Sequence, residues 1–295
     1  MVAQFDQRLF PFERHYFDRG DGVRMHYVDE GQGPPVVCVH GNPTWSFYYR
    51  NVILALQDDH RVIAPDHVGM GLSDKPDDAH YAYTLQARVD DLTRFIDSLR
   101  LNEPLTLVVH DWGGMIGFAW AVQHPEQVAK LVVLNTGAFP LPEDKKFPWP
   151  LALTRTPLGA LLVRGGNAFS LAATRMAMTH NQMPADVRRA YTAPYDSWAN
   201  RIATLRFVQD IPLQPGAPGF DIVKDTEAQL HKLAHLPMLI GWAGRDFVFD
   251  DAFLRVWQKH FPQAEVLYFE NAGHYVLEDA AAELVPRIAA FIRDV

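Results

Sequence analysis

Short apolar runs alternate along the chain with stretches of helical spacing. Four runs are typical of buried strands and cover residues 35–39, 61–64, 105–109 and 131–134. Between the second and third runs, apolar residues recur four, three, four and three positions apart, at Leu85, Val89, Leu92, Ile96 and Leu99. That spacing predicts an amphipathic helix with Thr84 as its N-cap. Strands that alternate with helices predict an α/β fold, a mostly parallel sheet with helices on both faces.

Outside this region, the same signals predict an N-terminal hairpin and a C-terminal return of the α/β pattern. The hairpin spans residues 14–30 around an Asp21-Gly22 turn. The other expected elements are helices at 45–56, 253–260 and 284–292 and strands at 238–243 and 266–269. The path of the last helix around Pro286 is left open.

From about Gly137 the pattern changes. Strand-like runs are absent until Pro237, and the interval is rich in proline and aromatic residues. We interpret residues 137–212 as a helical cap inserted into a core made of residues 1–136 and 213–295. The weaker alternative is a helical extension of the core, because long segments without a role of their own are uncommon.

The stretch 105–117 predicts a strand, a sharp turn with Asp111 at its apex, and a helix from near Met115. Nucleophiles of α/β-hydrolases sit on such a turn, which needs a glycine two residues later, here Gly113. A serine that displaces a leaving group from an sp3 carbon forms an ether that water does not cleave, whereas an aspartate forms an ester that water can hydrolyse. Asp111 therefore indicates carboxylate attack through a covalent ester. Taken alone, it is equally well interpreted as a helix cap.

Two further residues follow strand ends in the order of a catalytic triad. Asp246 comes after the run 238–243, and His274 follows the run 266–269. The order nucleophile, acid, base matches that of α/β-hydrolases, and parallel strands bring their carboxyl ends to one rim. Because an ionised carboxylate needs no deprotonation, His274 is predicted to activate the water that cleaves the ester, with Asp246 fixing its tautomer. A lone histidine is more often structural, but three roles in order favour catalysis.

A leaving group needs hydrogen-bond donors, and Trp112 and Asn42 can supply them from neighbouring strand ends. The indole N–H of Trp112 only donates, and the amide of Asn42 offers two donor hydrogens. Their backbone N–H groups are also placed to form an oxyanion hole for the tetrahedral intermediate of the ester. Considered singly, Trp112 suggests core packing and Asn42 a turn before Pro43.

Composition limits the classes of function. With 295 residues, 48% hydrophobic and 21% charged, the chain is typical of a globular protein with a large core. The net charge of −8 argues against nucleic acid or an anionic membrane surface as a main partner. The single Cys38 excludes an internal disulfide and fits a cytoplasmic location. No cofactor is called for, and neither an HExxH motif nor a cysteine cluster suggests a metal site.

Two stretches bear on membranes. The N-terminus lacks the apolar core of a signal peptide. Residues 147–163 are the nearest approach to a transmembrane segment, but Arg155 and several prolines interrupt them. No transmembrane segment is therefore predicted.

At HGNPTW, PDHVGMGLSD, HDWGG and NAGHYVLED the sequence resembles the haloalkane dehalogenases, over nearly the whole chain from about Val23. The resemblance implies the α/β-hydrolase fold, with a mostly parallel eight-stranded sheet, helices on both faces and an inserted helical cap. For the site, it implies Asp111 as nucleophile, His274 as base, and Trp112 and Asn42 as donors to the leaving group.

The acid of the triad differs between branches of that family. One branch carries it as glutamate after the sixth strand, where this chain has Asn135. The resemblance therefore implies Asp246 as the acid, as in the other branches.

The segments TWSFYYR, LNTGAFPLP, APYDSW and RFVQDIPL are similar to one subgroup, which includes the β-lactone decarboxylases of bacterial long-chain olefin biosynthesis. This resemblance implies conversion of long-chain cis-3-alkyl-4-alkyloxetan-2-ones, which are hydrophobic small molecules, to cis-alkenes and CO2. It also implies partner enzymes that make and activate the β-lactone. Residues 147–163 are a candidate contact surface for them, although a buried cap helix is the simpler interpretation.

Three other functions compete with this one. A haloalkane dehalogenase would hydrolyse 1-haloalkanes to alcohol and halide through an alkyl ester of Asp111. An epoxide hydrolase would use Tyr191 and Tyr195 to protonate the oxide, which would leave Trp112 and Asn42 unexplained. A catalytically silent binding protein would be expected to lose triad members, and none is missing.

Overall fold

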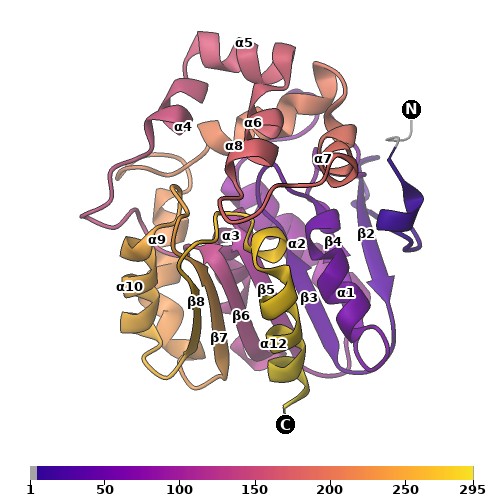
Figure 1. The fold of residues 1–295 in the computed structure, drawn as a ribbon, viewed down its shortest axis with the longest axis vertical. Helices are drawn as coiled ribbons and strands as arrows, with labels where there is room; N and C mark the ends of the chain where they lie inside the picture. Colours follow the sequence, from indigo (N-terminus) through magenta and orange to yellow (C-terminus); the bar gives the residue numbers. More distant parts are fainter. Residues whose placement is uncertain (1–4, 295) are drawn as a thin grey trace.

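The computed structural model describes residues 5–294 and is built around one eight-stranded sheet in the order β1-β2-β4-β3-β5-β6-β7-β8 (Figure 1). The strands are β1 (His15–Asp18), β2 (Arg24–Glu30), β3 (Pro35–Val39), β4 (Arg61–Pro65), β5 (Leu105–Asp111), β6 (Val128–Thr136), β7 (Met238–Ala243) and β8 (Glu265–Phe269). β1 and β2 form the predicted antiparallel hairpin, β2 pairs antiparallel with β4, and the remaining pairs are parallel. The mostly parallel α/β sheet is confirmed.

Side chains of the central strands point alternately to the two faces of the sheet, and each face has its own apolar core. Val37 and Val39 of β3 and Leu107 of β5 belong to the first core. Val36 and Cys38, the alternate residues of β3, belong to the second. Because both faces are covered, β3, β5 and β7 are buried along their whole length, as parallel strands between helix layers must be.

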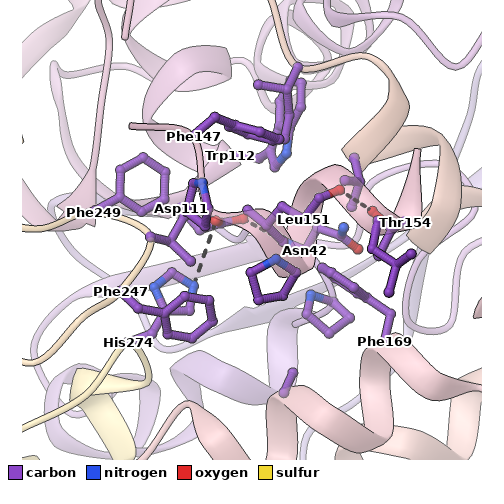
Figure 2. A pocket seen from close by; sticks show the side chains of 18 of the residues that line it. Asn42, Asp111, Trp112, Phe147, Leu151, Thr154, Phe169, Phe247, Phe249 and His274 are labelled. Carbon is purple, nitrogen blue, oxygen red and sulfur yellow. Dashed lines mark hydrogen bonds and ion pairs between the residues drawn. The ribbon is translucent and has the colours of Figure 1, made fainter. Parts of the chain in front are cut away.

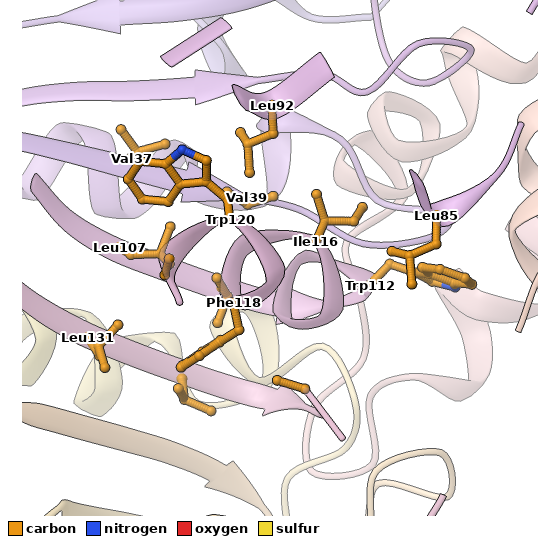
Figure 3. Packing of buried hydrophobic residues seen from close by; sticks show 14 of the residues in the cluster. Val37, Val39, Leu85, Leu92, Leu107, Trp112, Ile116, Phe118, Trp120 and Leu131 are labelled. Atoms are coloured by element: carbon orange, nitrogen blue, oxygen red, sulfur yellow. The ribbon is translucent and has the colours of Figure 1, made fainter. Parts of the chain in front are cut away.

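Helices supply the other half of each core. The first core takes side chains from α2 (Leu85–Leu99), α3 (Trp112–Ala121), α9 (Phe220–Gln229) and α10 (Asp251–His260), and the second from α1 (Arg50–Leu56) and α12 (Ala281–Arg293). Figure 3 shows Phe118 and Trp120 of α3 beside Val37, Leu107 and Leu131 of the strands. The predicted helix layers on both faces are confirmed.

Between β6 and β7 the structure contains only helices and loops. The helices are α4 (Trp149–Thr154), α5 (Pro157–Gly166), α6 (Ala168–Met176), α7 (Ala185–Thr192), η4 (Ala193–Tyr195), η5 (Ala199–Arg201), α8 (Ile202–Gln209), α9 and η6 (Leu230–Leu233). Helices α4 to α8 lie together on one side of the sheet, above its upper edge in Figure 1. On this basis we propose that residues 137–212 form a cap on a core made of residues 1–136 and 213–295.

The boundaries of several elements differ from those predicted. The expected helix at 45–56 begins as a 3₁₀ turn, η2 (Ser46–Tyr49), before α1. Two further 3₁₀ turns, η1 (Gln7–Leu9) and η3 (Pro125–Gln127), and the short helix α11 (Val276–Asp279) were not predicted. The last helix, α12, continues through Pro286, held on either side by Leu284 and Ile288 in the second core. No helix within residues 5–294 is long and apolar enough to cross a membrane.

Candidate active site

Asp111 ends β5 and directly precedes α3, at backbone angles that few residues other than glycine adopt (φ 53°, ψ −126°). Glycines make room for this turn. A Cβ at Gly113 would lie 1.9 Å from the carbonyl oxygen of Val39, and one at Gly41 would lie 2.1 Å from Oδ1 of Asp111. The predicted sharp turn is present, but α3 begins at Trp112 rather than near Met115. Asp111 occupies the N-cap position of α3, but its side chain makes no capping hydrogen bond to the helix.

We expect Gly113→Ala to disrupt this turn. The added methyl group would overlap the backbone carbonyl of Val39, which cannot move without displacing β3. The expected loss of stability is about 2 kcal/mol or more, measured by thermal unfolding. Gly166→Ala in α5 is the matched control, because its added methyl group would meet no atom within 4 Å. Equal melting temperatures for the two variants would contradict this account of the turn.

The structure brings the three predicted triad residues together. Nδ1 of His274 lies 2.7 Å from Oδ2 of Asp246. Nε2 of His274 lies 3.6 Å from Oδ2 of Asp111, and Figure 2 shows these two side chains facing each other. Oδ1 of Asp246 accepts hydrogen bonds from the backbone N–H groups of Val248 and Phe249, which orient its carboxylate. Asp111, His274 and Asp246 are all buried, so water screens their charges weakly.

Burial and neighbouring charges act on His274 in opposite directions. Burial lowers the pKa of His274, but the Asp246 and Asp111 carboxylates outweigh it and raise that pKa above its ordinary value. Burial raises the pKa of Asp111, opposed by His274 and by the backbone N–H groups of Asn42 and Trp112. Asp111 and His274 therefore favour each other's charged forms.

The two carboxylate oxygens of Asp111 have different surroundings. Oδ1 accepts a hydrogen bond from the backbone N–H of Asn42 at 2.6 Å, whereas Oδ2 lies nearest to His274. The backbone carbonyl of Asp111 accepts a hydrogen bond from Oγ1 of Thr136 on β6. The N–H of Asn42 thus holds Oδ1, the Thr136 contact holds the backbone, and Oδ2 is the oxygen that faces His274.

Asn42 and Trp112 line the same cavity as Asp111 and His274. The amide Nδ2 of Asn42 donates to the carbonyl oxygen of Thr204 at 3.1 Å, so one of its two donor hydrogens is already engaged. The indole of Trp112 is held by an edge contact with Phe207, at 5.1 Å between ring centroids. Four of the five predicted site residues thus share the cavity, and Asp246 lies behind His274.

The cavity has a volume of about 380 Å³ and lies between the core and the helices α4 to α6. Phe147, Leu151 and Phe169 line it from that helical side, and Phe247 and Phe249 from the core (Figure 2). Among its described lining residues only Asp111 and His274 are ionisable. Such a cavity suits a largely apolar molecule whose reacting end meets a few polar groups.

Two residues next to the site were not predicted. Nε2 of His110 lies 2.9 Å from the backbone carbonyl oxygen of His274, which steadies the loop that carries the imidazole. The guanidinium of Arg88, buried in α2 and paired with Asp210 at 3.1 Å, lies 5.4 Å from the Trp112 ring centroid. A signal existed for Arg88, because it follows Leu85 by three positions and so falls on the apolar face of α2.

Asn135, where one branch of the family carries its acid, has a structural role. Its Nδ2 donates to the carbonyl oxygens of Ala243 and Phe249, and its Oδ1 accepts from the N–H of Ala243. These bonds tie β6 to the end of β7 and the loop that carries Asp246.

Within the described residues, no group of three or more histidine, cysteine, aspartate or glutamate side chains could hold a metal ion.

The family model for the alpha/beta hydrolase fold matches residues 34–281 of this chain. The chain therefore belongs to the alpha/beta hydrolase family. Among curated relatives, a cis-3-alkyl-4-alkyloxetan-2-one decarboxylase from Shewanella oneidensis is 54% identical over 97% of this chain and 90% of the relative. A decarboxylase of the same name from Xanthomonas campestris is 49% identical, covering 96% of this chain and 97% of the relative. The subgroup that the motifs indicated is therefore confirmed.

More distant relatives are dehalogenases. Haloalkane dehalogenase 2 of Mycobacterium bovis is 34% identical over 97% of this chain and 96% of the relative. The crystal structure of a haloalkane dehalogenase from Bradyrhizobium elkani superposes with a TM-score of 0.85 at 26% identity, covering 95% of this chain and 97% of the other. The relatives of both groups are enzymes, and so is this protein.

Proposed function

We propose that the protein is a β-lactone decarboxylase that converts long-chain cis-3-alkyl-4-alkyloxetan-2-ones to cis-alkenes and CO2. The observation that carries the proposal is identity of 54% and 49%, over nearly the full length, to two relatives named for this activity, against 34% to a dehalogenase. The apolar cavity supports it, because two alkyl chains need apolar walls and the oxetanone ring needs the polar end formed by Asp111, Asn42 and Trp112.

In the first step, Oδ2 of Asp111 attacks C4, the alkyl-bearing ring carbon that is bonded to the ring oxygen. A carbon–oxygen bond to Asp111 forms as the ring carbon–oxygen bond breaks, which gives an alkyl ester and a free carboxylate. Oδ1 becomes the ester carbonyl oxygen and keeps its hydrogen bond from the N–H of Asn42. The indole N–H of Trp112 and the remaining amide hydrogen of Asn42 are the donors for the released carboxylate.

In the second step, the new carboxylate leaves as CO2. The electrons of its carbon–carbon bond form the alkene, and the bond to Oδ2 breaks, which restores the Asp111 carboxylate. Attack with inversion leaves the carboxylate anti to the Asp111 oxygen, the alignment that elimination requires. Inversion followed by anti elimination converts a cis ring to a cis alkene. This sequence consumes no water.

A haloalkane dehalogenase remains the second candidate, because the same donors suit a halide and His274 is positioned to activate water at the ester. The test uses the purified protein with a long-chain cis-β-lactone and, separately, with a 1-bromoalkane. We expect cis-alkene and CO2 from the lactone, measured by gas chromatography. Bromide release at ordinary enzymatic turnover without alkene would contradict the proposal and establish the second candidate.

Two further expectations accompany the proposed function. Enzymes that make and activate the β-lactone must act before this one, because the strained ring does not arise without activation of a hydroxyl or carboxyl group. We also propose a cytoplasmic location, supported by the single thiol, Cys38, which is buried in β3 and unpaired with any other cysteine.

A further inference from the structure

Charge is distributed unevenly along this acidic chain. It carries 35 acidic and 27 basic residues in all. Residues 145–185, which span α4, α5 and α6, contain no aspartate or glutamate. Their basic residues are Lys145, Lys146, Arg155, Arg164 and Arg175. Lys145 is largely buried and paired with Asp250, whereas Lys146 and Arg175 are exposed. The net charge of −8 argues against an anionic surface as a partner for the whole molecule, but residues 145–185 contain none of the acidic side chains that produce it.

The same helices expose large apolar side chains. Trp149 of α4 is 76% exposed, and Leu158 and Leu161 of α5 are 60% and 56% exposed. Helix α5 is the element farthest from the sheet in Figure 1. The expectation of a buried cap helix at 147–163 is therefore wrong for these positions, although Leu151 and Val163 are buried.

This apolar surface is continuous with the cavity. Trp149, Leu153, Leu162 and Met176 are exposed to solvent and also line the cavity, so they surround its opening. Together with Leu158 and Leu161, we call them the entry collar. Exposed apolar residues gathered in this way mark a binding surface rather than the scattered exposure of an ordinary surface.

We propose that the entry collar docks on an anionic lipid bilayer, so that apolar substrate passes from the membrane into the cavity without crossing water. Apolar side chains flanked by basic ones bind the interface of anionic membranes. Lys146 and Arg175, both exposed, flank the collar in sequence. A second copy of this chain is disfavoured as the occupant, because its residues 145–185 would offer Lys146 and Arg175 no acidic partner. The identity of the passing substrate rests on the proposed function, whereas docking itself does not.

The test is flotation of the full-length protein with vesicles. One set consists of phosphatidylcholine alone, and the other contains phosphatidylglycerol as well. We expect binding to the second set, and we expect it to weaken as the salt concentration rises. Lys146→Gln and Arg175→Gln should each weaken that binding about fivefold.

The apolar contribution is tested with Leu158→Ser/Leu161→Ser. These two side chains do not line the cavity, so turnover of a short, water-soluble substrate should stay unchanged. We expect vesicle binding about tenfold weaker, and a matching loss of turnover only for substrate dissolved in vesicles. Leu54→Ser is the matched control, because Leu54 is also exposed but lies on α1 of the core.

Three results would overturn the proposal. The first is no binding to phosphatidylglycerol vesicles. The second is equal weakening by Leu54→Ser and by the collar variant. The third is self-association in sedimentation experiments that the collar variant abolishes, which would identify a second copy of this chain as the occupant. Because vesicle binding is measured without turnover, failure of the decarboxylase proposal leaves this test intact.

Discussion

Replacing Asp111 by asparagine is expected to lower turnover of both the β-lactone and the bromoalkane by about 10⁴-fold or more. The carboxamide keeps the shape of the side chain, can still accept the hydrogen bond from the N–H of Asn42, and tolerates the positive φ of this position. What it loses is the negative charge on the oxygen that attacks carbon. Release of alkene and of bromide measures the effect, and Asp111→Ala should give the same loss.

The substitution should not destabilise the fold, which separates a chemical role from a structural one. Burial raises the pKa of Asp111, so the ionised carboxylate is less favoured in the folded protein than in the unfolded chain. Ionisation therefore lowers stability as the pH rises through the unfolded pKa, and a neutral amide removes that effect. We expect an unchanged or higher melting temperature at neutral pH. Turnover close to that of the wild type would remove the assignment of Asp111 as nucleophile.

The sheet and the candidate site could be predicted because each leaves a local mark in the sequence. Strands such as β3 and β5, buried on both faces, are continuous apolar runs with little alternation. The polar groups that follow them, Asp111 among them, stand out against that background. Once the strands are parallel, their carboxyl ends share a rim, so Asp246 and His274 follow from order along the chain alone.

Other features depend on contacts that no local pattern records. Gly113 and Gly114 suggested a turn, yet both lie inside α3, where close approach to Val39 and Thr136 leaves no room for a side chain. Periodicity placed Val89 and Leu99 on the apolar face of α2, whereas both are only partly buried. The spacing does place Arg88 on the buried face, but it does not record that Asp210, from another segment, pairs with its charge.

The exposure of the entry collar could not be predicted from the sequence either. An apolar stretch such as residues 147–163 predicts burial, because most apolar side chains in a helix find a partner. Whether a given apolar side chain is buried depends on whether another segment of the chain packs against that side of the helix. Here Leu158 and Leu161 remain exposed on the side of α5 that no other described element covers.

His274→Ala is expected to separate hydrolysis from decarboxylation. In the hydrolysis of a bromoalkane, water must attack the ester on Asp111, and Nε2 of His274 is the group positioned to accept its proton. The variant should release about one equivalent of bromide and then stop, with the alkyl group retained on the protein. Mass spectrometry of the intact chain detects that adduct. The decarboxylation proposed above needs no water, so alkene formation should continue at a reduced rate.

The pH dependence of the wild-type enzyme should divide in the same way. Burial lowers the pKa of His274, but the Asp246 and Asp111 carboxylates raise it above its usual value. As the pH falls through that raised pKa, the imidazole becomes protonated and can no longer accept a proton from water, so bromoalkane hydrolysis should decline. Asp246→Asn removes one of the two carboxylates and should move the midpoint of this decline to lower pH. Because ring opening and elimination transfer no proton to His274, alkene formation should lack this midpoint. The same pH midpoint for bromoalkane hydrolysis and for alkene formation would contradict this division. Equal loss of both activities in His274→Ala, without a trapped ester, would also contradict it. Either result would show that His274 takes part in both reactions.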